Sequence, residues 1–168
     1  MAQAYIAGGG DTSPTNFQDY NEYYSSLKVV FLEDLVTDPD VVTLKIIEKI
    51  DADLKITDSV DPEVRQRWYP FGIVKGYDAV MAPAKTFVQG MGRWKYVKPI
   101  YKALLDADKR DTALEWYNEV ADFYHPYVVE QLKKLLGLQG VEGTDSEQPS
   151  ALVKKWEEKF LSSPRFIN

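Results

Sequence analysis

The sequence contains no cysteine and a single histidine, His125. Disulfide bonds, thiolate metal sites and cysteine nucleophiles are therefore excluded, and a zinc site built from several histidines cannot form within this chain. The phosphate-loop pattern GxxxxGK[ST], the zinc-binding pattern HExxH and the nucleophile pattern GxSxG are absent as well. We therefore identify no catalytic residue and no metal ligand, and expect no cofactor in this chain.

Long apolar runs and an excess of positive charge are also missing. No apolar segment approaches the roughly 20 residues that cross a bilayer, and the N-terminal MAQAYIAGGG lacks the charged start and apolar core of a signal peptide. Lys and Arg number 20 against 26 Asp and Glu, a formal charge of -6, which argues against general binding to nucleic acid or anionic lipid. We expect no nucleic-acid partner, no membrane insertion and a cytoplasmic location.

The residues that are present suit a helical domain. The 168 residues are 45% hydrophobic, and apolar side chains recur at intervals of three and four, as in the stripe Val97, Ile100, Tyr101, Leu104 and Leu105. No segment favours a strand. Because short connections make successive helices antiparallel neighbours, we predict an all-α fold, a two-layer α-α superhelix with a HEAT-like or armadillo-like array of helices.

Local signals predict where the helices begin and end. The expected helices span residues 19–36, 39–52, 62–75, 77–89, 95–107, 111–123 and 126–136. Residues 38–40 and 61–63 both read Asp-Pro followed by an acid, which is typical of a capped helix start. Thr112 and Glu115 have the spacing of a capping box, and Gly137 followed by Leu138 is typical of a helix end.

The composition divides the chain into four parts. We predict a flexible leader at residues 1–16, a helical domain at 17–138, a linker at 139–148 and an amphipathic tail helix at 149–168. In the tail, Leu152, Trp156 and Phe160 recur at i, i+4 and i+8. This apolar face either packs on the domain's own core or binds the groove of a protein partner.

The segment GMGRWKYVKPIYK concentrates basic residues in an acidic chain. Arg93 and Lys95 follow Gly92 where a helix is expected to begin, and Trp94 lies between them. An arginine offers a planar fork that matches a carboxylate, and a lysine adds a point charge. The turn is therefore either an anion site or a hydrated surface turn. An RNA-binding surface is a third interpretation, which the acidic composition disfavours.

Four motifs in this region follow one another in a specific order. They are EVRQRW at residues 63–68, GRWKY at 92–96, KPIY at 98–101 and HP at 125–126. Over residues 62–138 the chain resembles the C-terminal helical domain of leukotriene A4 hydrolase and its zinc aminopeptidase relatives, and residues 26–36 resemble the preceding helix. Two positions depart from the family, with Trp94 where Met is usual and Tyr96 where Phe is common.

The resemblance implies a fold and a role. The family's domain is an all-α superhelix that closes one side of a catalytic cleft, while zinc and the catalytic residues belong to a separate domain. The family's Arg and Lys of the GRxK turn hold the substrate carboxylate, which implies this role for Arg93 and Lys95. A protein partner is thus implied, either a zinc aminopeptidase catalytic domain or a larger assembly in which the chain is a repurposed structural subunit.

Overall fold

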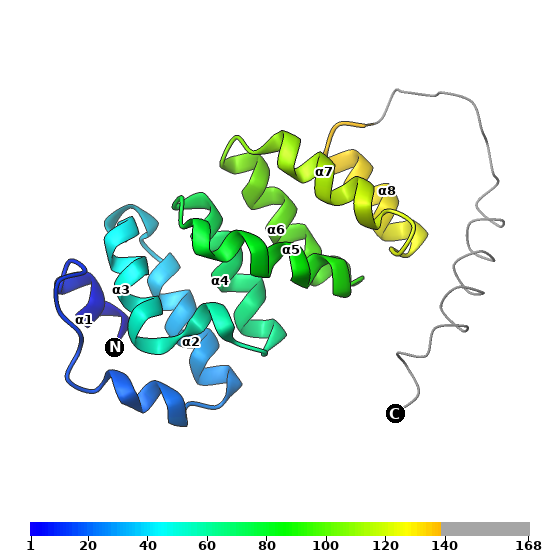
Figure 1. Cartoon of the computed structure of the whole chain (residues 1–168). Helices are drawn as coiled ribbons and strands as arrows, with labels where there is room; N and C mark the ends of the chain where they lie inside the picture. Colours follow the sequence, from blue (N-terminus) through cyan, green and yellow to red (C-terminus); the bar gives the residue numbers. More distant parts are fainter. Residues whose placement is uncertain (139–168) are drawn as a thin grey trace, which may run out of the picture.

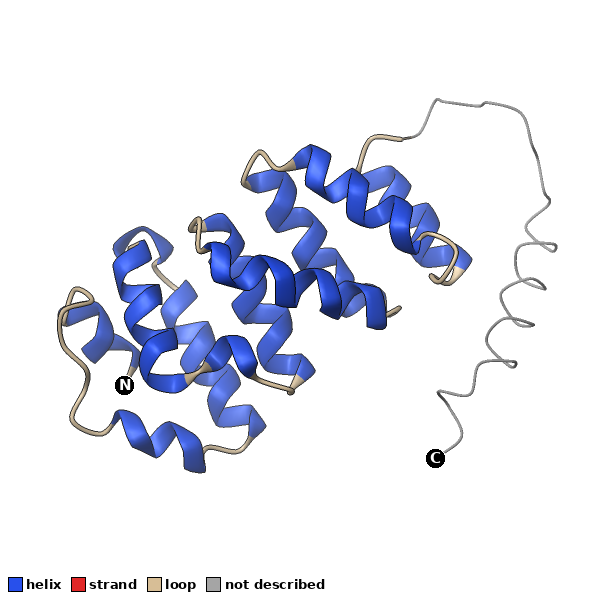
Figure 2. Cartoon of the chain, viewed as in Figure 1, coloured by secondary structure: helices blue, strands red, loops and turns tan. Residues whose placement is uncertain are grey.

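Residues 1–138 are described by the structure, a computed structural model, and they form helices joined by short loops (Figure 2). The α-helices are α1 (Ala2–Ala7), α2 (Ser25–Val36), α3 (Leu44–Leu54), α4 (Pro62–Val74), α5 (Met81–Gly90), α6 (Trp94–Asp106), α7 (Arg110–Val120) and α8 (Pro126–Leu135). Four short 3-10 helices are η1 (Phe17–Glu22), η2 (Pro39–Val41), η3 (Ile56–Asp58) and η4 (Asp78–Val80). No strand occurs within residues 1–138, so the predicted all-α class is confirmed.

The helices form two layers that progress along the molecule from α1 to α8 (Figure 1). In one layer α4 packs between α2 and α6, and α6 continues to α8. On the other side α3, α5 and α7 follow one another, with α5 packing on both α4 and α7. Such stacking of antiparallel helix pairs gives a superhelix, as predicted.

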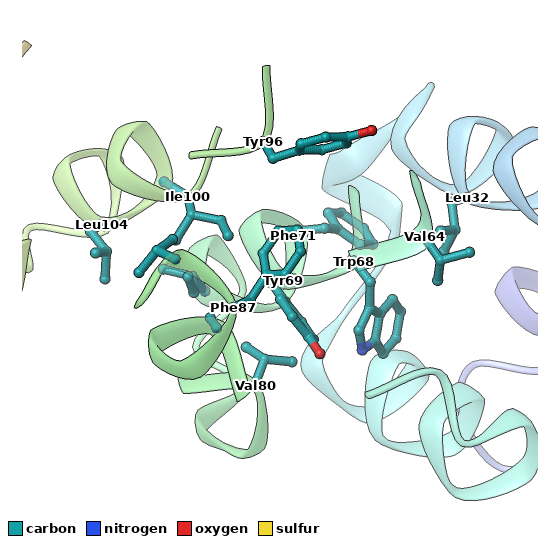
Figure 3. Close-up of a cluster of buried hydrophobic side chains, with 14 of the residues drawn as sticks. Leu32, Val64, Trp68, Tyr69, Phe71, Val80, Phe87, Tyr96, Ile100 and Leu104 are labelled. Atoms are coloured by element: carbon teal, nitrogen blue, oxygen red, sulfur yellow. The ribbon is translucent and has the colours of Figure 1, made fainter. Parts of the chain in front are cut away.

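Helix α4 occupies the centre of the core because neighbours cover it on several sides. Trp68 and Tyr69 are both buried, and Leu32 of α2 lies beside Val64 of α4 (Figure 3). Tyr69 meets Phe87 of α5 edge to face, with ring centroids 5.9 Å apart. The second half of α4 is buried almost throughout, from Trp68 to Ile73, whereas the charged residues of its first half are only partly buried.

Three predicted helix boundaries are confirmed by hydrogen bonds. The Asp61 carboxylate accepts from the backbone N–H of Glu63 at 2.8 Å and caps α4. His125 caps α8, because its Nδ1 accepts from the Tyr127 N–H at 3.2 Å. Beyond α8, Gly137 has a φ of 67° and the Leu138 N–H donates to the Lys133 carbonyl at 2.8 Å. These bonds satisfy orphan groups at the helix ends.

The helix start predicted at residue 39 and the capping box predicted at Thr112 are wrong. The Asp38 segment opens only the turn η2, and α3 begins at Leu44 after Thr43, whose hydroxyl accepts from the Ile46 N–H at 3.4 Å. Val42 between them is buried, so tertiary packing overrides the local capping preference. Thr112 lies inside α7, since the Ala113 N–H already donates to the Lys109 carbonyl at 3.1 Å.

The N-terminal segment also differs from the expected flexible leader at residues 1–16. Tyr5 of α1 is fully buried, meets Phe31 of α2 edge to face, and donates its hydroxyl to Asp53 of α3 at 3.0 Å. Ala2 and Tyr5 of α1 are both buried, and α1 packs on α2 and α3. The predicted linker at 139–148 and tail helix at 149–168, with Leu152, Trp156 and Phe160, lie outside the described residues.

Candidate carboxylate-binding turn

The turn between α5 and α6 places Arg93 and Lys95 at a loop-to-helix junction, as the sequence predicted. Arg93 is the N-cap residue of α6, with an extended backbone, and its carbonyl accepts from the N–H groups of Tyr96 at 2.9 Å and Val97 at 3.1 Å. No side chain caps this helix start. Lys95 follows in the first turn of α6, so both basic residues belong to the positive end of the helix dipole.

Contacts from the segment before α8 fix this turn. A Cβ atom added at Gly92 would lie 3.6 Å from Phe123 and 3.9 Å from Tyr124, so the turn lies directly against these two rings. The Tyr124 hydroxyl donates to the carbonyl of Val88 on α5 at 2.8 Å. Burial raises the pKa of Tyr124, so its hydroxyl stays protonated and remains a donor.

Lys95 is engaged by an acid on the neighbouring helix. Its Nζ donates to Oε1 of Glu63 on α4 at 2.6 Å, although 60% of the lysine side chain is exposed. The same Nζ lies 5.2 Å from the centroid of the Tyr96 ring. Two interactions thus orient the ammonium group, and one of its three N–H donors is used by Glu63.

Glu63 accepts hydrogen bonds from both its own helix and α6. Its Oε1 also accepts from the Tyr96 hydroxyl at 2.9 Å, while Oε2 accepts from Gln66 at 2.5 Å and Arg67 at 3.2 Å. The hydrogen bond from Lys95, aided by those from Tyr96 and Arg67, lowers the pKa of Glu63 to about 2. The carboxylate is therefore ionised at neutral pH and ties the start of α4 to the start of α6.

The ion pairs continue from α4 to α2. Arg67 donates to Oε1 of Glu33 through Nη2 at 2.8 Å and through Nε at 3.0 Å. Glu33, Arg67, Glu63 and Lys95 thus alternate in charge across three helices. The sequence identifies Glu63 as an acid at a helix start and as the first residue of the EVRQRW motif. Nothing in the local spacing points to its contact with Lys95, which lies 32 residues away.

The other basic residues of the segment 90–102 have different surroundings. Lys102 pairs with Asp106 on its own helix at 2.6 Å, and Lys98 Nζ lies 5.7 Å from the centroid of the Trp94 ring. Arg93 is exposed, and within residues 1–138 no side chain forms an ion pair or hydrogen bond with its guanidinium. The fork of Arg93 can therefore meet a carboxylate from outside the domain.

The described residues 1–138 show neither a metal-binding cluster nor a membrane-spanning helix. Within residues 1–138 no group of three or more His, Asp or Glu side chains is placed to hold a metal ion. None of the helices in this described range has the length and apolar character needed to span a bilayer.

Known proteins resemble the chain over most of the helical array. Leucine aminopeptidase 2 of Ajellomyces capsulatus is 30% identical over 108 residues, which are 64% of this chain and 17% of that protein. Leucine aminopeptidase 2 of Aspergillus clavatus is 25% identical over 126 residues, 75% of this chain and 20% of that protein. The chain thus matches a fifth or less of the length of these relatives. No solved structure matches it significantly.

The family model described as leukotriene A4 hydrolase, C-terminal, matches residues 23–136. The match begins just before α2 and ends just after α8, so it includes the whole layer that carries Glu63 and the turn with Arg93 and Lys95. It covers well over half of the chain. The chain therefore belongs to the leukotriene A4 hydrolase C-terminal domain family.

Proposed function

We propose that the chain is a non-catalytic helical domain that packs on a zinc aminopeptidase catalytic domain and helps to bind the carboxylate of its substrate. The observation that carries the proposal is that Arg93, two residues before Lys95 on the family's GRxK turn, is exposed and has no ion-pair partner within residues 1–138. The match to only part of each aminopeptidase relative supports a role beside a catalytic partner.

The chemistry of the turn suits a carboxylate. Arg93 presents two parallel N–H donors to the two carboxylate oxygens, and Lys95 retains two donors after its bond to Glu63. The start of α6, which no side chain caps, adds backbone N–H groups and the positive end of the dipole. In a closed cleft, such positioning raises the rate of reaction at a zinc centre supplied by the partner.

The test begins with the tagged full chain, used to isolate its partner from native extract. Mass spectrometry would identify the partner, and peptidase assays would compare a tripeptide with its C-terminally amidated form. We expect Arg93→Ala to lower kcat/KM for the free-carboxylate peptide by about 10-fold or more, the size of one charge-assisted hydrogen bond, and to leave the amide unaffected. Lys98→Ala removes an exposed cation from the same helix and serves as the control. Equal loss for both peptides would contradict carboxylate binding.

A structural or protein-interaction subunit of a larger assembly is the second candidate. At the start of α2, the N-cap residue Tyr24 and the helical residues Leu27 and Val30 recur every three positions and are 67%, 38% and 58% exposed. Exposed apolar side chains grouped on one helix suit contact with another protein. The tail face predicted at Leu152, Trp156 and Phe160 is a further candidate for such contact. Isolation of an assembly without aminopeptidase activity would favour this function.

A further inference from the structure

The helical array ends at α8, where the described residues supply no helix to complete the last pair. Helix α6 packs against both α5, which precedes it, and α7, which follows it. Helix α8 lies in the same layer and packs on α6, but it is the last helix of residues 1–138, so no described helix follows it (Figure 1). The last helix of a stacked array needs a cover or a polar outer face, because no next repeat buries it.

One face of α8 is only partly covered. Tyr127 is 53% exposed, and Gln131 and Leu135 are partly buried. These three residues recur every four positions, so they share one face of the helix. Leu138, just beyond the helix, is also only partly buried. Helix α8 therefore presents a largely apolar row, two turns long, that a further helix could cover.

The sequence after the domain contains a segment that matches this row. The family match ends at residue 136, so residues 149–168 are additional to the family's domain. In this segment Leu152, Trp156 and Phe160 recur every four positions, which is the interval of the row on α8. If the segment is helical, as its apolar spacing predicts, each row spans about 12 Å.

The intervening chain is long enough to bring the two rows together. Residues 139–148 extend to at most about 36 Å, whereas the 10 residues of α8 are about 15 Å long. The segment could therefore lie along α8 in either direction. A short tether gives an effective concentration in the millimolar range, which favours the tethered segment over a free partner. One face of so short a helix is also far smaller than the roughly 800 Å² that each chain buries in a stable dimer.

We infer that residues 149–168 form a helix that packs its apolar face on the partly covered face of α8 and completes the last helix pair of the array. The face of α8 is thus an interaction surface whose occupant is the chain's own C-terminal segment. The inference does not depend on the carboxylate-binding function. It removes the tail from the surfaces that a larger assembly could contact.

Hydrogen exchange of the full chain, measured by mass spectrometry in dilute solution, tests this packing. In the wild-type chain the amides of residues 151–160 should exchange at least about 10-fold more slowly than those of an unstructured chain. Tyr127→Asp places a charge on the face of α8 and leaves the tail sequence unchanged. Because an Asp in the first turn favours a helix, α8 should stay folded. The protection of residues 151–160 should be lost in this variant.

Matched controls separate this contact from general effects of substitution. Tyr24→Asp changes another exposed tyrosine, at the start of α2, and should leave the tail protected. Within the tail, Trp156→Ala should abolish the protection. Lys154→Ala, on the opposite side of the predicted helix, should keep the exchange rates within about twofold of wild type. Circular dichroism would show that each variant is folded.

Three results would overturn the inference. Unprotected amides at residues 151–160 of the isolated wild-type chain would show that the tail is not packed and would leave its apolar face to a protein partner. Protection that persists in Tyr127→Asp, or that is lost equally in Tyr24→Asp, would place the contact elsewhere. Protection that disappears on dilution, together with a dimer in native mass spectrometry, would assign the face of α8 to a second copy of the chain.

Discussion

Among single residues, Glu63 joins the start of α4 to the start of α6 through hydrogen bonds. Its carboxylate accepts from Lys95 and Tyr96 on one helix and from Gln66 and Arg67 on the other. These bonds favour the ionised form, which is why the pKa of Glu63 falls from its ordinary 4.5 to about 2. Stability must therefore depend on the protonation of this residue.

The contribution of Glu63 to the unfolding free energy should decrease as the pH is lowered. Because the pKa of Glu63 is lower in the folded chain than in the unfolded one, its stabilising effect is complete above about pH 4.5 and is lost as the pH falls towards about 2. The difference in unfolding free energy between wild type and Glu63→Gln should therefore shrink over this range in urea titrations. Tyr96→Phe, which keeps the carboxylate, should still lose stability with acid. A pH-independent difference would show that Glu63 does not titrate in this way.

Among the elements, α1 shows how a very short helix can belong to the core. It packs on both α2 and α3, and Tyr5 supplies its main anchor by meeting Phe31 and donating to Asp53. Six residues cannot form a stable helix alone, since helix nucleation is costly. The helix therefore depends on docking, and docking depends on Tyr5.

Substitution of Tyr5 tests this dependence. Tyr5→Ala should lower the unfolding free energy by about 3 kcal/mol or more, as for other buried aromatic truncations. Tyr5→Phe should cost only about 1 kcal/mol, because it removes the hydrogen bond to Asp53 and keeps the packing. Tyr24→Ala, at an exposed position, is the control and should have little effect. Urea denaturation measures the unfolding free energy of all three variants. A negligible effect of Tyr5→Ala would instead support the flexible leader predicted from the sequence.

At the scale of the whole molecule, one connected core extends along the array. Buried apolar residues run from Ala2 in α1 to Leu136 after α8 and form a single cluster. In stacked arrays each helix pair contacts mainly its neighbours, so cooperativity depends on strong interfaces between pairs. The interface between α4 and α6 lies in the middle of the array and joins its two halves (Figures 1 and 3).

Ile100, fully buried on α6, tests whether the array unfolds as one unit. Ile100→Ala should lower the unfolding free energy by about 3 kcal/mol, and the midpoints from tryptophan fluorescence and from circular dichroism should fall together. Trp68 of α4 and Trp116 of α7 are buried reporters on either side of the substitution. Val60→Ala, at a highly exposed position, is the control. Separate midpoints for the two signals would show that the halves unfold independently.

Features controlled by neighbours in sequence were predictable. The apolar stripe of α6, the Asp61 and His125 caps and the helix end at Gly137 depend on residues a few positions apart. The placement of Arg93 and Lys95 at a helix start followed from the same local signals. Errors arose where a local signal competed with burial, as at Asp38, where the helix starts later because Val42 enters the core.

The sequence by itself therefore determined the helical class, most helix boundaries and the family, because helical periodicity and capping act within one or two turns. Only the tertiary structure decided that α1 docks, through a contact between residues 48 apart, and that Lys95 is held by Glu63, 32 residues away. Such contacts depend on how helices stack in space. Local spacing carries no information about them, since any exposed acid in the chain could have been the partner of Lys95.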